Sequence, residues 1–85
     1  MKILIINIMN KFRNKNGELS AYGLLCGYVQ RRTKAGIERK MYMEHRHYHV
    51  MKFSESGERL CWETFCSNEL TKARKFYNNN KTVRS

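Results

Sequence analysis

The sequence predicts a small α+β domain, an antiparallel meander of three to four strands followed by one C-terminal helix packed on one face. Aromatic and β-branched residues alternate through most of the chain, Gly-containing segments separate these runs, and the apolar spacing becomes helical near the end. A length of 85 residues suits one domain. We expect a strand or arm plus basic linker at 1–18, the domain at 19–80 and a frayed tail at 81–85.

The first elements follow from local composition. Residues 1–9 are β-branched and apolar, which predicts a strand or a packing arm, and residues 10–18 are polar and rich in Asn and Gly, as is typical of a loop. Residues 19–32 carry aromatic and β-branched residues at strand spacing, so we expect a strand there. The sequence TKAG at 33–36 predicts a turn that closes a hairpin.

The run from Glu38 to Phe53 contains no Gly, Pro, Asn or Asp, so no favoured turn residue interrupts it. One strand of this length would be unusual. Two interpretations stay open, namely a single bent strand or two strands that reverse near His45 to His47. The sequence SESGE at 54–58 then predicts a hairpin loop, with Gly57 available for a positive φ.

The last two elements are a strand and a helix. RLCWETFC at 59–66 predicts a strand with Trp62 on one face and Phe65 on the other. The helix follows, with Ser67 or Asn68 as its N-cap. Its apolar residues recur at helical spacing and are expected to pack on the sheet. They are Leu70, Ala73 and Tyr77, with Phe76 beside them.

The charge balance favours a polyanionic partner. Seventeen Lys and Arg residues oppose seven acidic residues, a formal net charge of +10. Basic residues that contact phosphates release condensed counterions, so this excess favours nucleic acid, although a merely solvated surface would look the same. The odd count of three cysteines, the absence of an export signal and the absence of a long apolar run predict a cytoplasmic protein that does not insert into a membrane.

The sequence predicts neither catalysis nor a cofactor. No Asp occurs, the Glu residues are scattered, and no phosphate-binding Gly-rich loop is present. His45, His47 and His49 alternate along one segment, but a straight strand separates the outer two by about 13 Å, too far for one metal ion. An H-x-H pair with a third ligand such as Cys26 or Cys61 stays an alternative. We expect no metal site.

Interleaved basic and aromatic residues indicate nucleic-acid binding, with DNA favoured. GYVQRRTKAGIERKMY and HRHYHVMK place Arg and Lys among Tyr, Gln and Thr along a predicted ribbon. Guanidinium groups can contact guanine edges and Gln can pair with adenine, provided that the ribbon enters a groove. The residues expected to contact nucleic acid are Gln30, Arg31, Arg32, Lys34, Arg39, Lys40, Arg46 and Lys52.

The segment YHVMKFSESGERLCWETFCSNELTKARKFYNNN, Tyr48 to Asn80, resembles the three-stranded-sheet-plus-helix DNA-binding domains of plant ethylene-response factors and of phage integrase arm-binding domains. Those domains combine a Gly-containing hairpin, an aromatic strand with a TF-type step and a helix. ETF at 63–65 and ARKFY at 73–77 match this pattern. The resemblance implies that an exposed sheet face enters the major groove. At the matching positions it implicates Arg46, Lys52, Arg59 and Trp62.

A protein partner is the alternative. Small basic domains without catalytic motifs include phage-type inhibitors and adaptors that bind one host or defence protein, as in host takeover or anti-CRISPR activity. Such a partner would itself be a nucleic-acid-binding protein, and the apolar segment ILIINIM would suit strand pairing with it or with a second copy in a homodimer.

Overall fold

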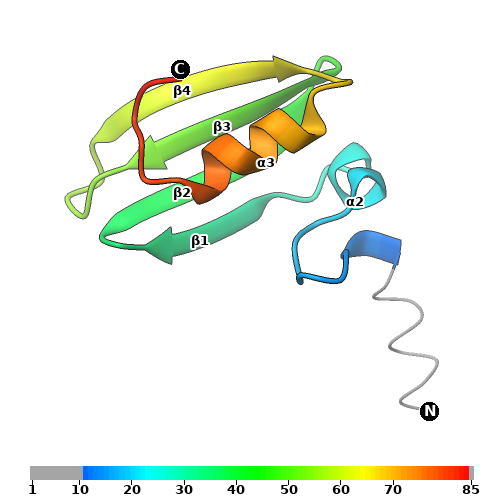
Figure 1. Ribbon diagram of the computed structural model, residues 1–85, viewed down its shortest axis with the longest axis horizontal. Helices are drawn as coiled ribbons and strands as arrows, with labels where there is room; N and C mark the ends of the chain where they lie inside the picture. The colour runs from blue at the N-terminus through cyan, green and yellow to red at the C-terminus, as the bar shows by residue number, and fades with distance from the viewer. Residues whose placement is uncertain (1–10, 85) are drawn as a thin grey trace, which may run out of the picture.

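The structure is a computed structural model that describes residues 11–84 (Figure 1). The strand or arm expected at 1–9 lies outside the described residues, as does Ser85. The described part contains one four-stranded antiparallel sheet with neighbouring strands in chain order, a short helix before it and a longer helix after it. The elements are α2 (Ala21–Leu25), β1 (Gln30–Lys34), β2 (Ile37–Glu44), β3 (His47–Phe53), β4 (Arg59–Cys66) and α3 (Leu70–Asn78). The predicted fold class is confirmed.

The strand expected across residues 19–32 is wrong for its first part, where α2 forms instead. The Ser20 hydroxyl accepts a hydrogen bond from the Gly23 N–H (3.0 Å) and so caps the first turn. A Cβ at Gly23 would lie 2.7 Å from the Phe12 carbonyl oxygen, so the close approach of these segments requires glycine. The side-chain cap and this close contact outweigh the strand-like alternation of the aromatic residues.

The run from 38 to 53 forms two strands, β2 and β3, with a two-residue turn at His45 and Arg46. Both turn residues have positive φ, 52° and 63°, as do Ala35 and Gly36 in the β1–β2 turn, 54° and 72°. Turns of this hand match the twist of the paired strands. A non-glycine residue in this region costs on the order of 1 kcal/mol. The strand pairing therefore outweighs unfavourable turn residues.

The remaining predicted strand and loop are confirmed. The Ser54 N–H donates to the Glu58 carbonyl (2.8 Å) and Gly57 has a φ of 88°, which closes the loop between β3 and β4. The register shifts between Lys52 and Phe53, a bulge at the start of the β3–β4 pairing. Trp62 and Phe65 lie on opposite faces, as expected: Trp62 is exposed and Phe65 is buried.

The helix α3 covers one face of the sheet (Figure 1). Its N-cap is Glu69 rather than Ser67 or Asn68, and Glu69 makes no side-chain cap. Its carboxylate accepts instead from the Cys66 N–H (2.9 Å), which secures the connection from β4. The predicted apolar stripe is confirmed, since Ala73, Phe76 and Tyr77 are buried and Leu70 packs beside them.

The helix divides the sheet into two unlike surfaces. The covered face carries the core side chains of the central strands, and the open face carries the alternate positions. Core residues of the covered face are Met41, Tyr48, Val50 and Phe65, which pack with α3 and with Leu19 and Leu24. Among residues 11–84 no helix is long and apolar enough to cross a membrane.

The segment after α3, within the range 81–85 expected as a frayed tail, contacts the sheet as far as it is described, to residue 84. It runs back from the end of α3 toward β4 (Figure 1). The Arg84 guanidinium donates to the Thr64 carbonyl (2.7 Å) and lies over the Phe65 ring, 4.2 Å from its centroid. These contacts, together with hydrogen bonds from Lys52 to the start of the segment, keep residues 79–84 on the domain.

Candidate nucleic-acid interface

Three aromatic side chains form a row across the open face, one from each of β2, β3 and β4. Tyr42 lies opposite His49 in the strand register, with ring centroids 5.0 Å apart and an interplanar angle of 13°. His49 lies next to Trp62, with centroids 5.9 Å apart. We call Tyr42, His49 and Trp62 the aromatic row. Side chains of alternate strand positions stand on the same side, so the sheet register brings these three together.

Hydrogen bonds fix the middle ring. The Trp62 indole N–H donates to His49 Nδ1 (3.0 Å), so that nitrogen is an acceptor and the ring proton resides on Nε2. His49 Nε2–H in turn donates a hydrogen bond to the Glu44 carbonyl oxygen, 3.3 Å away. Both ring nitrogens of His49 are therefore used within the protein, and the row is preorganised before any ligand arrives.

Cations lie at both ends of the aromatic row. The Lys40 ammonium is 5.2 Å from the Tyr42 centroid, and the Arg59 guanidinium carbon is 5.3 Å from the Trp62 centroid. Such cation–π contacts at exposed sites contribute about 0.5–1 kcal/mol each. Burial raises the pKa of the Tyr42 hydroxyl, so this group stays a neutral donor at physiological pH. The open face thus presents aromatic surface framed by positive charge.

The rings of the row are covered to different extents. Tyr42 stacks on His49 and has Lys40 over its ring, whereas Trp62 meets the edge of His49 at Nδ1. Trp62 is nonetheless 49% exposed, so its indole forms the most prominent part of the surface. A nucleobase cannot stack between Tyr42 and His49 without separating them.

Four of the predicted contact residues gather on this open face. Arg31 lies directly opposite Lys40 in the β1–β2 register, and Arg59 and Trp62 belong to the other end of the same surface. Arg32 and Lys34 are exposed but occupy the alternate positions of β1, on the opposite side of that strand. Arg46 is exposed in the β2–β3 turn, at the end of the sheet.

Gln30, Arg39 and Lys52 are not surface residues, so their expected contacts with nucleic acid do not hold in this structure. All three are buried under the helix side of the sheet. Gln30 Oε1 accepts from the Leu19 N–H (2.7 Å), which ties β1 to the segment before α2. Alternation showed which residues share a face, but the packing of α3 decided which face is covered.

Arg39 and Lys52 lie opposite each other in the β2–β3 register and hold the end of α3. The Arg39 guanidinium donates to the carbonyls of Tyr77 (3.0 Å) and Asn79 (2.7 Å), and Lys52 Nζ donates to the Asn79 carbonyl (2.8 Å). Within residues 11–84 neither cation has a carboxylate at ion-pair distance. Burial, and then the neighbouring Arg39 charge, lower the pKa of Lys52 to about 8.

The three histidines are spread over different environments. His45 is in the turn, His47 Nδ1 lies 2.9 Å from the His45 carbonyl, and His49 belongs to the aromatic row. In the part of the chain that the structure describes, no three His, Cys, Asp or Glu side chains could hold a metal ion together. Cys26 and Cys61, the ligands considered as alternatives, are free thiols there.

The sequence did not single out the pairing of Tyr42 with His49. Tyr48 and His49 are neighbours on β3, yet Tyr48 is buried in the core, whereas His49 lies at the centre of the open face. A correct assignment of the two-residue turn at His45 and Arg46 would have given this register.

Comparison with known proteins finds no matching family, no similar curated protein and no similar solved structure.

Proposed function

We propose that this chain is a small non-catalytic nucleic-acid-binding protein that uses the open sheet face, with duplex DNA as the favoured ligand. The observation that carries the proposal is the aromatic row with a cation over each end. Arg31 adds a further positive charge next to Lys40, and the net charge of +10 provides long-range attraction to a polyanion.

Duplex fits this surface better than single strand. Proteins that bind single strands offer exposed ring faces on which successive bases stack. Here Tyr42 and His49 are stacked on each other and Lys40 lies over Tyr42, so a base cannot enter between these rings, whereas the cations can offer donors to phosphates and groove edges. The element order β2, β3, β4, α3 is also that of the DNA-binding domains which the sequence resembles.

The test is fluorescence anisotropy of labelled duplex and single-stranded oligonucleotides over a range of salt concentrations. Arg31→Ala with Lys40→Ala should weaken duplex binding about tenfold or more, and should reduce the slope of log affinity against log salt by about one for each lost phosphate contact. Lys15→Ala removes one positive charge in the exposed loop before α2, against two in the double variant, so it serves as the control when losses are compared per charge. The proposal would be contradicted if duplex affinity did not change with salt concentration, or if the control variant lost as much affinity per charge as the double variant.

A protein partner remains the competing outcome of this test. A pull-down from host lysate, with and without nuclease treatment, separates the two. If the open face binds nucleic acid directly, nuclease should remove the captured material and Trp62→Ala should reduce capture. Retention of a single protein after nuclease treatment, equally by wild type and by Trp62→Ala, would favour an inhibitor or adaptor that binds through another surface.

A further inference from the structure

A second polar site lies at the edge of the sheet that β1 forms. It is a pocket of about 330 Å³, bordered by the loop before α2, by β1 and by the end of α3. Its wall carries three guanidinium side chains, one carboxylate and one tyrosine, which come from three separate segments of the chain. They are Arg13, Arg31, Arg32, Glu18 and Tyr77.

The loop at 13–18 is held in place by its own hydrogen bonds. The Asn14 side-chain oxygen accepts from the Glu18 N–H (3.0 Å). The Arg13 guanidinium donates to the Gly17 carbonyl (2.8 Å). The two oxygens of the Glu18 carboxylate accept from the side-chain amides of Asn14 (3.3 Å) and Asn78 (3.0 Å), which joins the loop to α3. This wall of the pocket is therefore formed before any ligand binds, and its carboxylate already has two donors.

The Tyr77 hydroxyl is a buried donor without an acceptor. Tyr77 is fully buried, and within residues 11–84 its hydroxyl forms no hydrogen bond. Burial raises the pKa of Tyr77, so the group stays protonated at neutral pH. Gln30 lies close enough to lower that pKa, which is the effect of a donor, so Gln30 does not accept the Tyr77 proton. A buried donor that lacks an acceptor is unfavourable, and an acceptor oxygen in the pocket would satisfy it.

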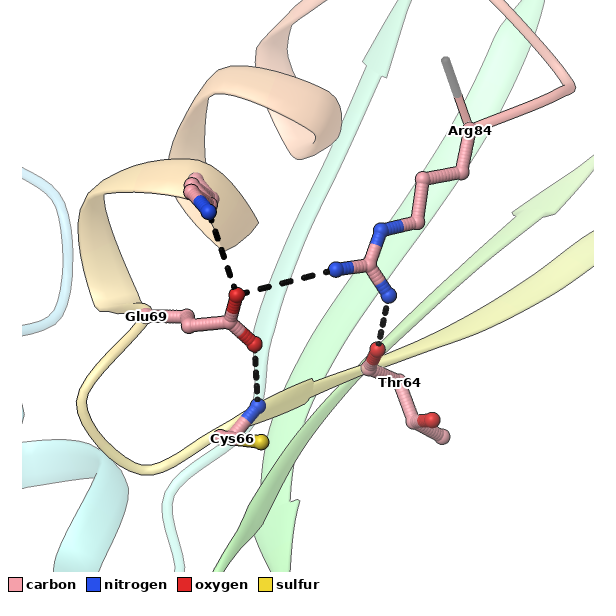
Figure 2. Close-up of polar contacts among 5 residues, drawn as sticks. Thr64, Cys66, Glu69 and Arg84 are labelled. Atoms are coloured by element: carbon pink, nitrogen blue, oxygen red, sulfur yellow. Dashed lines mark hydrogen bonds and ion pairs between the residues drawn. The ribbon is translucent and has the colours of Figure 1, made fainter.

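The guanidinium groups of the pocket also lack carboxylate partners. In the part of the chain that the structure describes, none of Arg13, Arg31 and Arg32 has a carboxylate at ion-pair distance. A cation near the start of α3 differs in this respect, since Figure 2 shows Glu69 beside Arg84, with an oxygen 3.8 Å from an Arg84 nitrogen. Three guanidinium groups against one carboxylate in the pocket wall favour an anion over a neutral or cationic ligand.

We propose that this pocket binds one phosphate group, whose oxygens accept hydrogen bonds from the Tyr77 hydroxyl and from the guanidinium groups of Arg13 and Arg32. A guanidinium presents paired N–H donors that match phosphate oxygens, and a phosphate has enough oxygens to accept from all three side chains. Arg13 and Arg32 are exposed, so their side chains can rearrange to admit the anion to the buried hydroxyl.

Arg31 connects this pocket with the open face. It lines the pocket and also lies directly opposite Lys40 in the β1–β2 register. A nucleic acid on the open face would therefore pass close to the pocket with its backbone. The phosphate comes either from that backbone or from a free phosphorylated molecule.

The test is a nuclear magnetic resonance titration of the full chain with inorganic phosphate at constant ionic strength, which follows the amide signals of residues 13–18 and of β1. Tyr77→Phe removes the hydroxyl and keeps the ring, so it should weaken phosphate binding about tenfold. Because the hydroxyl has no acceptor in the free protein, the melting temperature of this variant should not fall. Tyr42→Phe makes the same change on the open face and should bind phosphate as wild type does.

A second pair of variants tests the charge. Arg32→Gln should weaken phosphate binding by a similar factor, whereas Arg46→Gln, the same change in the exposed β2–β3 turn, should leave it unchanged. Four results would overturn the site. They are unchanged phosphate binding in Tyr77→Phe, a lower melting temperature of that variant, equal weakening by the two arginine variants, and acetate binding as tight as that of phosphate.

Duplex titrations identify the source of the phosphate. If inorganic phosphate displaces duplex at constant ionic strength, and Tyr77→Phe weakens duplex binding as well, the source is the nucleic-acid backbone. If Tyr77→Phe weakens the binding of inorganic phosphate alone, the source is a free phosphorylated molecule. The site does not depend on the proposed function, since phosphate binding that requires Tyr77 stands even if Lys40→Ala leaves duplex binding unchanged.

Discussion

On the covered face of the sheet, Arg39 and Lys52 lie buried beneath the end of α3 and donate to main-chain carbonyls. On the open face, Lys40 lies over the half-buried Tyr42 ring and Arg59 over the exposed Trp62 ring. Arg39 and Lys40 are adjacent in sequence and belong to one strand, yet one holds the fold together and the other faces solvent. The difference teaches that a basic residue in a strand cannot be assigned to binding until its face is known.

The largest expected contrast compares Phe65 with Trp62 on β4. Phe65→Ala removes a buried ring that packs on Phe76, so we expect a loss of about 3–5 kcal/mol in the free energy of unfolding. Trp62→Ala should cost less than about 1 kcal/mol, because Trp62 is half exposed. Urea unfolding followed by circular dichroism measures both. A similar loss in the two variants would remove the distinction between the covered and open faces.

The next contrast compares Arg39 with Lys40. Arg39→Met leaves the Tyr77 carbonyl without its Arg39 donor and the Asn79 carbonyl with Lys52 alone, and we expect a loss of about 2–3 kcal/mol in unfolding free energy. Lys40→Met should change stability by about 0.5 kcal/mol or less and should weaken duplex binding instead. Denaturant unfolding and anisotropy, measured on both variants, give the two readouts. Reversal of this pattern would place Arg39 in the binding surface.

The smallest effect concerns pH. The folded chain holds the pKa of Lys52 near 8, whereas the unfolded chain has the ordinary value of 10.5. Above about pH 8 the unfolded state therefore binds more protons, and the free energy of unfolding should rise with pH. The rise should end near pH 9. Burial raises the pKa of Cys61 above 9.0, so at higher pH the folded state keeps the Cys61 proton that the unfolded state loses, and this lowers the free energy of unfolding.

The measurement is urea unfolding of wild type and Lys52→Met between about pH 7 and 9. Lys52→Met should lose the rise, and amide hydrogen exchange should show faster opening of residues 79–84, because the donor to Asn79 and Lys81 is gone. Arg39 and Cys61 lie opposite residue 52 in the neighbouring strands and are unchanged in the variant, so the comparison isolates the charge of Lys52. An equal rise with pH in the variant would assign the effect to another group.

Sequence reasoning succeeded where one local rule acted alone. The Gly57 loop, the strand at 59–66 and the stripe of Ala73 and Tyr77 each follow from turn chemistry or periodicity, and each is present. It failed at α2, where the Ser20 cap and the contact of Gly23 with Phe12 override strand-like alternation. It also could not choose between one strand and two around His45, because neither turn residue is one that favours a turn.

The sequence by itself determined that a strand at 59–66 precedes the C-terminal helix, the excess of positive charge and the alternation that separates Trp62 from Phe65. Only the tertiary structure decided that α3 covers the face of Arg39 and Lys52, and that Tyr42, His49 and Trp62 form one row. The physical reason is that periodicity is a property of one strand. Which face is buried, and which side chains become neighbours, depends on cross-strand register and on packing between distant segments.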